Sequence, residues 1–327
     1  MDTVDFVSEP LPSQALVCPD HERGVLYVRL TATRAPGSRM VAVLPEAGAA
    51  VRSAVEAAAG GEPVRRAVIV GVDVAFAAVD ASGRNLALDA FVDVVRALTD
   101  AGVPFLWRTR AGIAAGGLPP LVAHVLSAAG RLCTVELGIA TVDDDEARAL
   151  EGDLATTSKA RLQLASALVA RGIAVRALVD PLVPMLTDQQ GPLDDLVGAL
   201  AAAGVRKLGA RYITLTRDRA RVIAARLAGM QKALLQGVFA DEPWRQPSGR
   251  DADASGPREL HKRIPAAIRR RGHERLIETG ARHGVIVEIL DPVDADEMNR
   301  PVQPPPVTKA KPPRARPQLE LFQTRRR

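Results

Sequence analysis

The sequence predicts an α/β fold, a partial (βα)6 barrel of the TIM type, with a doubly wound open sheet as the alternative. From about residue 40 to 215, short apolar runs alternate with stretches of helical periodicity. Strands joined by helices in this order require right-handed crossovers and a parallel sheet. Three joints share one form, in which a helical pattern ends at a glycine, the residue that best supplies a left-handed C-cap. These joints are Ala101-Gly102-Val103, Arg171-Gly172-Ile173 and Ala203-Gly204-Val205.

Six apolar runs are the expected strands, too few for a closed eight-stranded barrel: 15–18, 67–72, 104–107, 132–139, 173–179 and 207–215. The helical patterns lie at 45–59, 87–101, 118–129, 143–150, 158–171, 191–203 and 217–238. In one of them, Leu162, Leu164, Leu168 and Val169 have the spacing of a helix with one buried face.

The chain divides by composition into four parts. Residues 1–244 form the barrel, and 245–257, which include the stretch QPSGRDADASGP, form a linker. Residues 258–299 are a basic helix–strand appendage, because His283-Gly284-Val285 repeats the helix-end signature before an apolar run. Residues 300–327 hold seven of the 24 prolines, so we expect a disordered Pro/Arg-rich tail with no core to join.

Charge and hydropathy exclude several classes of protein. The 327 residues are 47% hydrophobic and 25% charged, which is typical of a globular chain. No apolar stretch is long enough to span a membrane, and the N-terminus is acidic and lacks the apolar core of a secretion signal. We therefore expect a cytoplasmic protein with no membrane partner.

The net charge of +5 is unevenly distributed. Residues 300–327 carry +7 and residues 258–275 carry +5, which leaves −7 for the remainder. Such basic segments suit an anionic partner such as DNA, although a solvated, charged tail is an equally good interpretation. No aromatic residue is interleaved with these charges, so base stacking is not expected. The candidate DNA-binding residues are Lys262, Arg263, Arg269, Arg270, Arg271, Arg325, Arg326 and Arg327.

No catalytic constellation is visible in the sequence. There is no phosphate-binding glycine loop of the Walker type and no GxSxG motif, and the five histidines lack metal-ligand spacing. The polar residues at the expected strand ends form no recognisable acid–base pair or nucleophile–base set. We therefore assign no catalytic residue and no metal ligand. These strand-end residues are Asp73, Arg108, Thr109, Arg110, Glu136, Arg176 and Asp180.

Residues 13–240 resemble the radical-SAM proteins related to spore photoproduct lyase, often labelled DNA repair photolyase-like. The clearest stretch is 135–215, where LVDPLVPMLTD at 178–188 resembles the element VAPVIPGLTD of that family. ARALE at 147–151, Arg161-Leu162 and Gly172-Ile173 also fit. These are mostly scaffold positions, so the resemblance implies the partial-barrel fold more than the activity.

The motifs that hold the cofactors of that family are not retained. When its C-x3-C-x2-C cluster loop is laid on HERGVLYVR, the cysteine positions hold Pro19, Arg23 and Leu26, with Cys18 one residue out of step. Of the G-T-x-T-D-P-Y-Q motif only Gly71 remains. An I-T-K element becomes RTR, in which Thr109 is kept. The vestigial cofactor-site positions are therefore Pro19, Arg23, Leu26, Gly71 and Thr109. We expect no iron–sulfur cluster, because neither proline, arginine nor leucine supplies a thiolate.

The tail contains the sequence QLELF at residues 318–322. It resembles the pentapeptide by which many bacterial repair proteins and polymerases bind the DNA sliding clamp. Leu321 and Phe322 are apolar anchors for a groove, Gln318 can hydrogen-bond at its edge, and Leu319 completes the match. Docking of this tail on its own domain is the alternative.

The resulting prediction is a non-catalytic, DNA-associated or DNA-repair accessory protein that tethers to the sliding clamp. A second possibility is a cluster-free enzyme or small-molecule-binding protein that keeps S-adenosylmethionine in the barrel mouth. A third is a scaffold that keeps the fold only to present its tail. The sequence names neither a substrate nor an oligomeric state nor a pathway.

Overall fold

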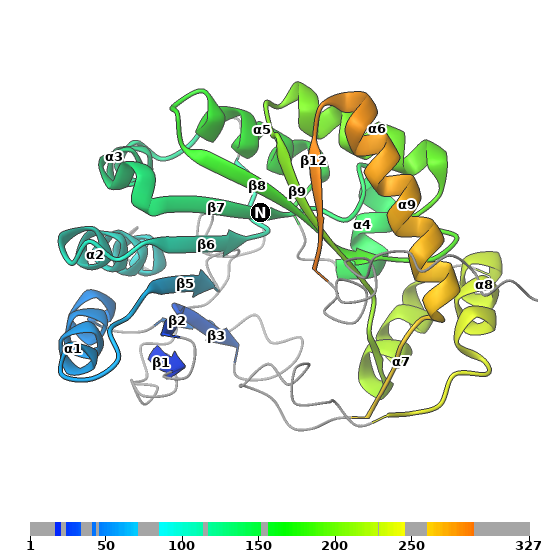
Figure 1. Ribbon diagram of the computed structural model, residues 1–327, viewed down its shortest axis with the longest axis horizontal. Helices are drawn as coiled ribbons and strands as arrows, with labels where there is room; N and C mark the ends of the chain where they lie inside the picture. The colour runs from blue at the N-terminus through cyan, green and yellow to red at the C-terminus, as the bar shows by residue number, and fades with distance from the viewer. Residues whose placement is uncertain are drawn as a thin grey trace, which may run out of the picture.

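A computed structural model describes residues 17–20, 24–33, 41–43, 46–70, 85–113, 117–151, 156–227, 229–245 and 260–290. Its centre is an eight-stranded sheet in the order β1-β2-β5-β6-β7-β8-β9-β12 (Figure 1). β1 is antiparallel to β2, and every other neighbouring pair is parallel. The strands are β1 Val17–Asp20, β2 Val25–Arg29, β5 Arg66–Val70, β6 Phe105–Thr109, β7 Cys133–Gly138, β8 Ala174–Leu182, β9 Lys207–Tyr212 and β12 Ile286–Ile289.

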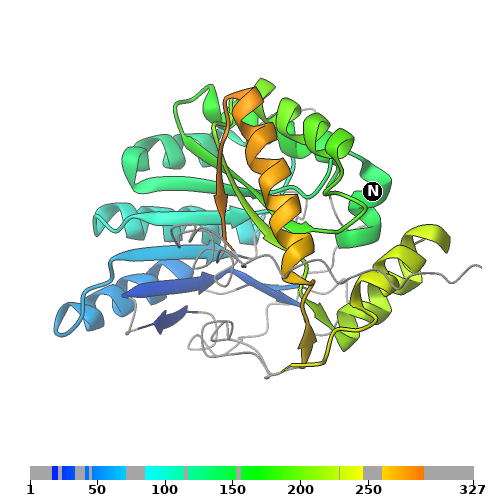
Figure 2. The same ribbon diagram turned by 45° about the vertical axis from the view of Figure 1, so that its right-hand side comes forward.

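The helices that connect these strands lie along one side of the curved sheet (Figures 1 and 2). The core fills the space between, with Phe91 of α2 packed 4.8 Å from Trp107 of β6, centroid to centroid. The sheet is not closed, so the fold is the predicted partial barrel. The helices are α1 Ala47–Ala59, α2 Leu86–Asp100, α3 Pro120–Ala129, α4 Asp144–Glu151, α5 Ser158–Val169, α6 Gln190–Ala202, α7 Arg217–Arg226, α8 Gly229–Phe239 and α9 Ala266–His283, with a 3-10 turn η2 at Gly130–Leu132.

The three predicted helix-to-strand joints are confirmed. Gly102, Gly172 and Gly204 have φ angles of +64°, +74° and +85°, the left-handed conformation that glycine adopts at low cost. The amide of the next residue then bonds back into the helix, as in Val205 N to Leu200 O at 3.0 Å. At Gly204 any side chain would also meet Val169 Cγ1 at 2.8 Å.

The start of the sheet differs from the prediction. The run expected as the first strand is the antiparallel strand β1, and the parallel series begins at β2, within the segment that the family motif had placed in a loop. Residues Val25, Leu26 and Val28 are buried there. Burial of these apolar side chains therefore favours a strand over a loop at residues 25–29.

The C-terminal part of the chain joins the main sheet rather than standing apart from it. β12 pairs with β9 in parallel, and α9 packs on α6 and β12. In a separate small sheet, β10 Leu215–Thr216 pairs with β11 His261–Lys262, and Arg245 bridges to His261. A second small sheet pairs β3 Thr31–Thr33 with β4 Val41–Val43. No helix in the described ranges is both long and apolar enough to cross a membrane.

Candidate functional site

A ladder of charged residues crosses the face of the sheet opposite the helices. Strand alternation puts Phe105, Trp107 and Thr109 on the buried, helix-covered side, so Arg108 points to the other side. Arg108, Glu136 and Arg176 are register neighbours on β6, β7 and β8.

Glu136 is the centre of this ladder and is fully buried. Its carboxylate accepts hydrogen bonds from Arg108 Nε and from Arg176 Nε, the latter at 2.9 Å. Arg176 Nη1 donates to Glu288 of β12 at 3.0 Å. Each carboxylate has an arginine partner, so the ladder is charge-balanced and ties β6 to β12; it offers no spare acid or base.

Arginines gather on the same face at the carboxyl ends of the strands, where barrels place their chemistry. Arg110 Nη2 donates to the backbone oxygen of Asp180 at 2.8 Å. Arg219 reaches the group from α7, and burial lowers the pKa of its guanidinium, with Asp180 opposing and Arg110 adding to the shift. The buried Nε of Arg211 has no hydrogen-bond partner among the residues that the structure describes. We call Arg110, Asp180 and Arg219 the mouth cluster; it has one carboxylate for two guanidinium groups and suits an anion.

The scaffold role of the residues that carry the family resemblance is visible in their contacts. Arg161 and Glu151 form an ion pair whose side chains are only 1% and 3% exposed. Arg161 also donates to the backbone oxygen of Gly138 at 2.9 Å and to Thr156 Oγ1 at 3.1 Å, which fixes α4 and α5 to the end of β7.

The LTD element likewise stabilises a turn after β8. Thr187 Oγ1 accepts from Val183 N at 2.8 Å, and Asp188 Oδ1 accepts from Met185 N at 2.8 Å. The other oxygen of Asp188 accepts from the hydroxyl of Tyr212 at 2.8 Å. All three polar contacts hold the backbone and β9 in place, so these residues serve the fold.

Of the vestigial cofactor-site positions, the three that the structure describes do not form one cluster. Pro19 and Leu26 are cross-strand partners in the β1–β2 hairpin, near the amino end of β2. Thr109 is buried at the opposite, carboxyl end of β6 and accepts a hydrogen bond from Ala111 N at 3.0 Å. Arg23 and Gly71 lie outside the described residues.

The structure brings an aromatic ring to the basic residues, which linear spacing did not predict. Lys262 Nζ lies 5.4 Å from the ring centroid of Trp244, and Arg217 Cζ lies 5.3 Å from it. Lys262 also donates to Phe239 O at 2.8 Å. We call Arg217, Trp244 and Lys262 the basic–aromatic patch. The pairing of β10 with β11 creates it, so its members are far apart in the sequence.

The other DNA-binding candidates are placed differently. Arg269 is only 5% exposed and bonds through Nη1 to the backbone oxygen of Ile264, so it adds no exposed charge to α9. Arg270 and Arg271 are exposed on α9, and Arg263 is half-buried beside β11. The residues at 318–322 and 325–327 lie outside the described part of the chain.

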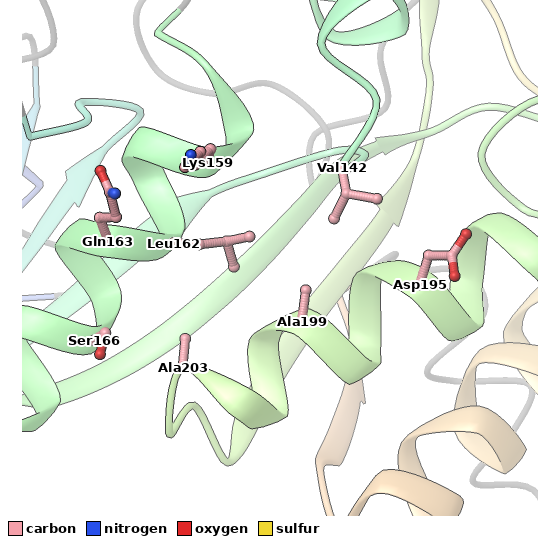
Figure 3. A pocket seen from close by; sticks show the side chains of 8 residues that line it. All are labelled: Val142, Lys159, Leu162, Gln163, Ser166, Asp195, Ala199 and Ala203. Atoms are coloured by element: carbon pink, nitrogen blue, oxygen red, sulfur yellow. The ribbon is translucent and has the colours of Figure 1, made fainter.

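A shallow groove of about 460 Å³ lies between α5 and α6 (Figure 3). Val142, Leu162, Ala199 and Ala203 give it an apolar floor. Figure 3 shows Lys159 and Asp195 on different helices and toward different parts of the groove rather than converging. The two charged residues of the groove therefore do not act together on one ligand group.

Comparison with known proteins identifies the fold. No protein-family model and no curated protein matches the chain. A structure of a spore photoproduct lyase mutant with bound S-adenosylmethionine and dinucleoside spore photoproduct is similar, with a TM-score of 0.59, 12% identity, 86% of this chain covered and 81% of that one. A structure of spore photoproduct lyase complexed with dinucleoside spore photoproduct has a TM-score of 0.53 and 12% identity, with 78% of this chain and 70% of that one covered. The chain thus has the radical-SAM fold of spore photoproduct lyase, as the sequence resemblance implied.

The iron–sulfur cluster that this fold implies does not fit the residues of the chain. Such a cluster needs three thiolates from the protein, and the sequence contains two cysteines. Cys133 opens β7 at its amino end, and burial raises the pKa of its thiol to about 12, so it stays protonated at neutral pH. Cys18 lies in β1.

Proposed function

We propose that this chain is a DNA-associated protein, accessory to DNA repair, that has the radical-SAM fold without radical chemistry. The observation that carries the proposal is the basic–aromatic patch. The cysteine count supports its second half, because two cysteines cannot supply three cluster ligands.

The patch combines the two features that single-stranded nucleic acid requires of a binding surface. Arg217 and Lys262 supply positive charge for the phosphates, and Trp244 supplies a ring on which a base can stack. Arg270 and Arg271 extend the exposed charge along α9. Phosphate contacts do not read sequence, so we expect binding without strong sequence preference.

The tail residues Gln318, Leu319, Leu321 and Phe322 complete this proposal as a tether to a bacterial sliding clamp. A short peptide binds weakly alone, but attachment of one protein to the other raises the effective concentration at the second site. The chain would therefore bind more tightly to DNA that carries the clamp than to either partner alone, because the body binds the DNA while the tail binds the clamp.

The test is fluorescence anisotropy of a labelled single-stranded oligonucleotide titrated with the full chain. Trp244→Leu should weaken binding by about 1–3 kcal/mol, the cost of one lost stacking contact. Arg217→Gln and Lys262→Gln should weaken it and also reduce its salt dependence. Arg96→Gln, at an exposed position of α2, is the matched control and should change neither quantity.

Equal weakening by Arg96→Gln, or wild-type affinity in Trp244→Leu, would contradict the assignment of the patch. Anaerobic reconstitution with iron and sulfide tests the second half of the proposal. We expect no stoichiometric cluster and no cleavage of S-adenosylmethionine.

The mouth cluster favours a second candidate, a cluster-free enzyme or binding protein for a small anionic molecule or S-adenosylmethionine. Arg219 occupies a desolvated position beside Asp180 and Arg110. Burial of its guanidinium costs free energy, and a bound carboxylate would offset that cost. Calorimetric titration with S-adenosylmethionine distinguishes this candidate. Binding that is lost in Arg219→Met would support it.

A further inference from the structure

The structure holds a second cationic site, at the end of the sheet opposite to the mouth cluster. A cavity of about 680 Å³ lies at the amino ends of β5 to β9. This volume is in the range of small-molecule sites. Its lining includes five cations, Arg66, Arg131, Arg176, Arg206 and Lys207, and a single carboxylate, Glu288.

Two of these cations are already engaged. Arg176 is bonded to Glu136 and Glu288, which also neutralises the carboxylate of the cavity. Arg206 Nη1 donates to Ala201 O, a carbonyl at the end of α6, at 3.3 Å. A cation at this edge can thus hydrogen-bond to the free carbonyl groups at the end of a helix. That role accounts for Arg206.

The remaining three cations have no such role. The side chains of Arg66, Arg131 and Lys207 are exposed and make no hydrogen bond or ion pair with any residue that the structure describes. They come from the start of β5, from η2 before β7, and from the start of β9. The fold therefore brings three separate segments together around one cavity with an excess of positive charge.

We propose that this cavity binds a small organic molecule that carries two or more phosphate groups. Guanidinium groups from two segments can each take a phosphate by paired hydrogen bonds, and Lys207 adds a point charge. Leu106, Leu132 and Val175 line the wall and would accommodate the organic part. A concave site with apolar walls suits a small ligand better than the backbone of a nucleic acid.

The experiment is calorimetric titration of the full chain with ADP, AMP and inorganic pyrophosphate. We expect ADP to bind more tightly than AMP, because its second phosphate engages a further cation, and more tightly than pyrophosphate, because only ADP has an organic part. Arg131→Gln and Lys207→Gln should each weaken ADP binding about tenfold, the effect of one lost charge-assisted contact. Arg66→Gln should act in the same direction.

Arg171→Gln is the matched control. Arg171 is exposed at the same edge of the sheet, but its guanidinium donates to Ala167 O and does not line the cavity. Unchanged ADP binding in this variant supports the site. The proposal is wrong if ADP does not bind the wild type, if Arg171→Gln weakens ADP binding equally, or if the cavity variants weaken only oligonucleotide binding. These residues lie outside the basic–aromatic patch, so failure here leaves the proposed function untouched.

Discussion

Glutamates 151, 136 and 288 show how the cost of removing a charge depends on what surrounds it. The arginine partner of Glu151 is buried like the glutamate itself, whereas Glu136 is held by Arg108 and Arg176, whose side chains are 45% and 24% exposed. Glu288 is itself 61% exposed. Loss of a partner leaves a guanidinium uncompensated, and this costs most where water cannot reach it.

We therefore predict a graded series in urea unfolding. Glu151→Gln should lower the free energy of unfolding by about 3–5 kcal/mol. Glu136→Gln should cost about 1–2 kcal/mol, because water can solvate its two arginine partners. Glu288→Gln should cost under about 0.5 kcal/mol. Equal losses at positions 151 and 288 would contradict the assignment of the buried pair.

Cys133 gives a pH dependence with a defined sign. Its thiol has a pKa of about 12 in the folded chain, against an ordinary value of 9.0. Between these values the unfolded chain releases the proton and the folded chain keeps it, so the free energy of unfolding falls as pH rises from 9 to 12. Cys133→Ala should show a shallower decline in this window than the wild type. The comparison of the two proteins removes the shared titration of lysine and tyrosine.

At the scale of elements, Gly272 allows α9 to pack closely against Tyr212 of β9. A Cβ at this position would lie 1.5 Å from the hydroxyl of Tyr212, within the contact that joins α9 to β9. Gly272→Ala must therefore displace either the helix or the tyrosine that bonds to Asp188. We predict a loss of about 2–3 kcal/mol in the free energy of unfolding, by analogy with overpacked cores.

Gly237 provides the control within a helix. It lies in α8 with no atom near the position of a Cβ, so Gly237→Ala should stabilise the chain by about 0.5–1 kcal/mol. Thermal melting of both variants checks the pair. Similar behaviour of the two alanines would show that α9 is not held as described.

The sequence could predict an element when the residues that determine it lie within that element or next to it. The central strands are apolar runs between glycine caps, and both signals are local. The sequence analysis did not predict β2, because the motif alignment took precedence over its apolar residues Val25, Leu26 and Val28. The place of β12 in the sheet, and the contact of Trp244 with Arg217 and Lys262, depend on pairings between distant segments. Periodicity contains no information on such pairings, so the candidate site was predicted only in its charge.

At the scale of the whole molecule, the tail and the barrel should act as separable units. Replacement of Leu321 and Phe322 by Ala removes both apolar anchors, and each such truncation typically costs about 2 kcal/mol of binding energy. The double variant should lose measurable binding to a bacterial sliding clamp in surface plasmon resonance, while the melting temperature stays unchanged. A lower melting temperature would mean that the tail docks on its own domain. Oligonucleotide binding by the patch should be unaffected.

The unclosed sheet has a consequence for self-association. Where a sheet ends, a strand offers unsatisfied backbone groups to any other chain that can extend the ladder. β12 has a neighbouring strand, β9, on one side only among the described strands, and Ile286 is 68% exposed there. The strand is four residues long, and Glu288 puts a carboxylate in its middle that is bound to Arg176. A strand this short disfavours the addition of a foreign strand, and a new neighbour would also have to desolvate the ion pair of Glu288 with Arg176. We therefore expect the same glutamate that adds little to stability to limit self-association.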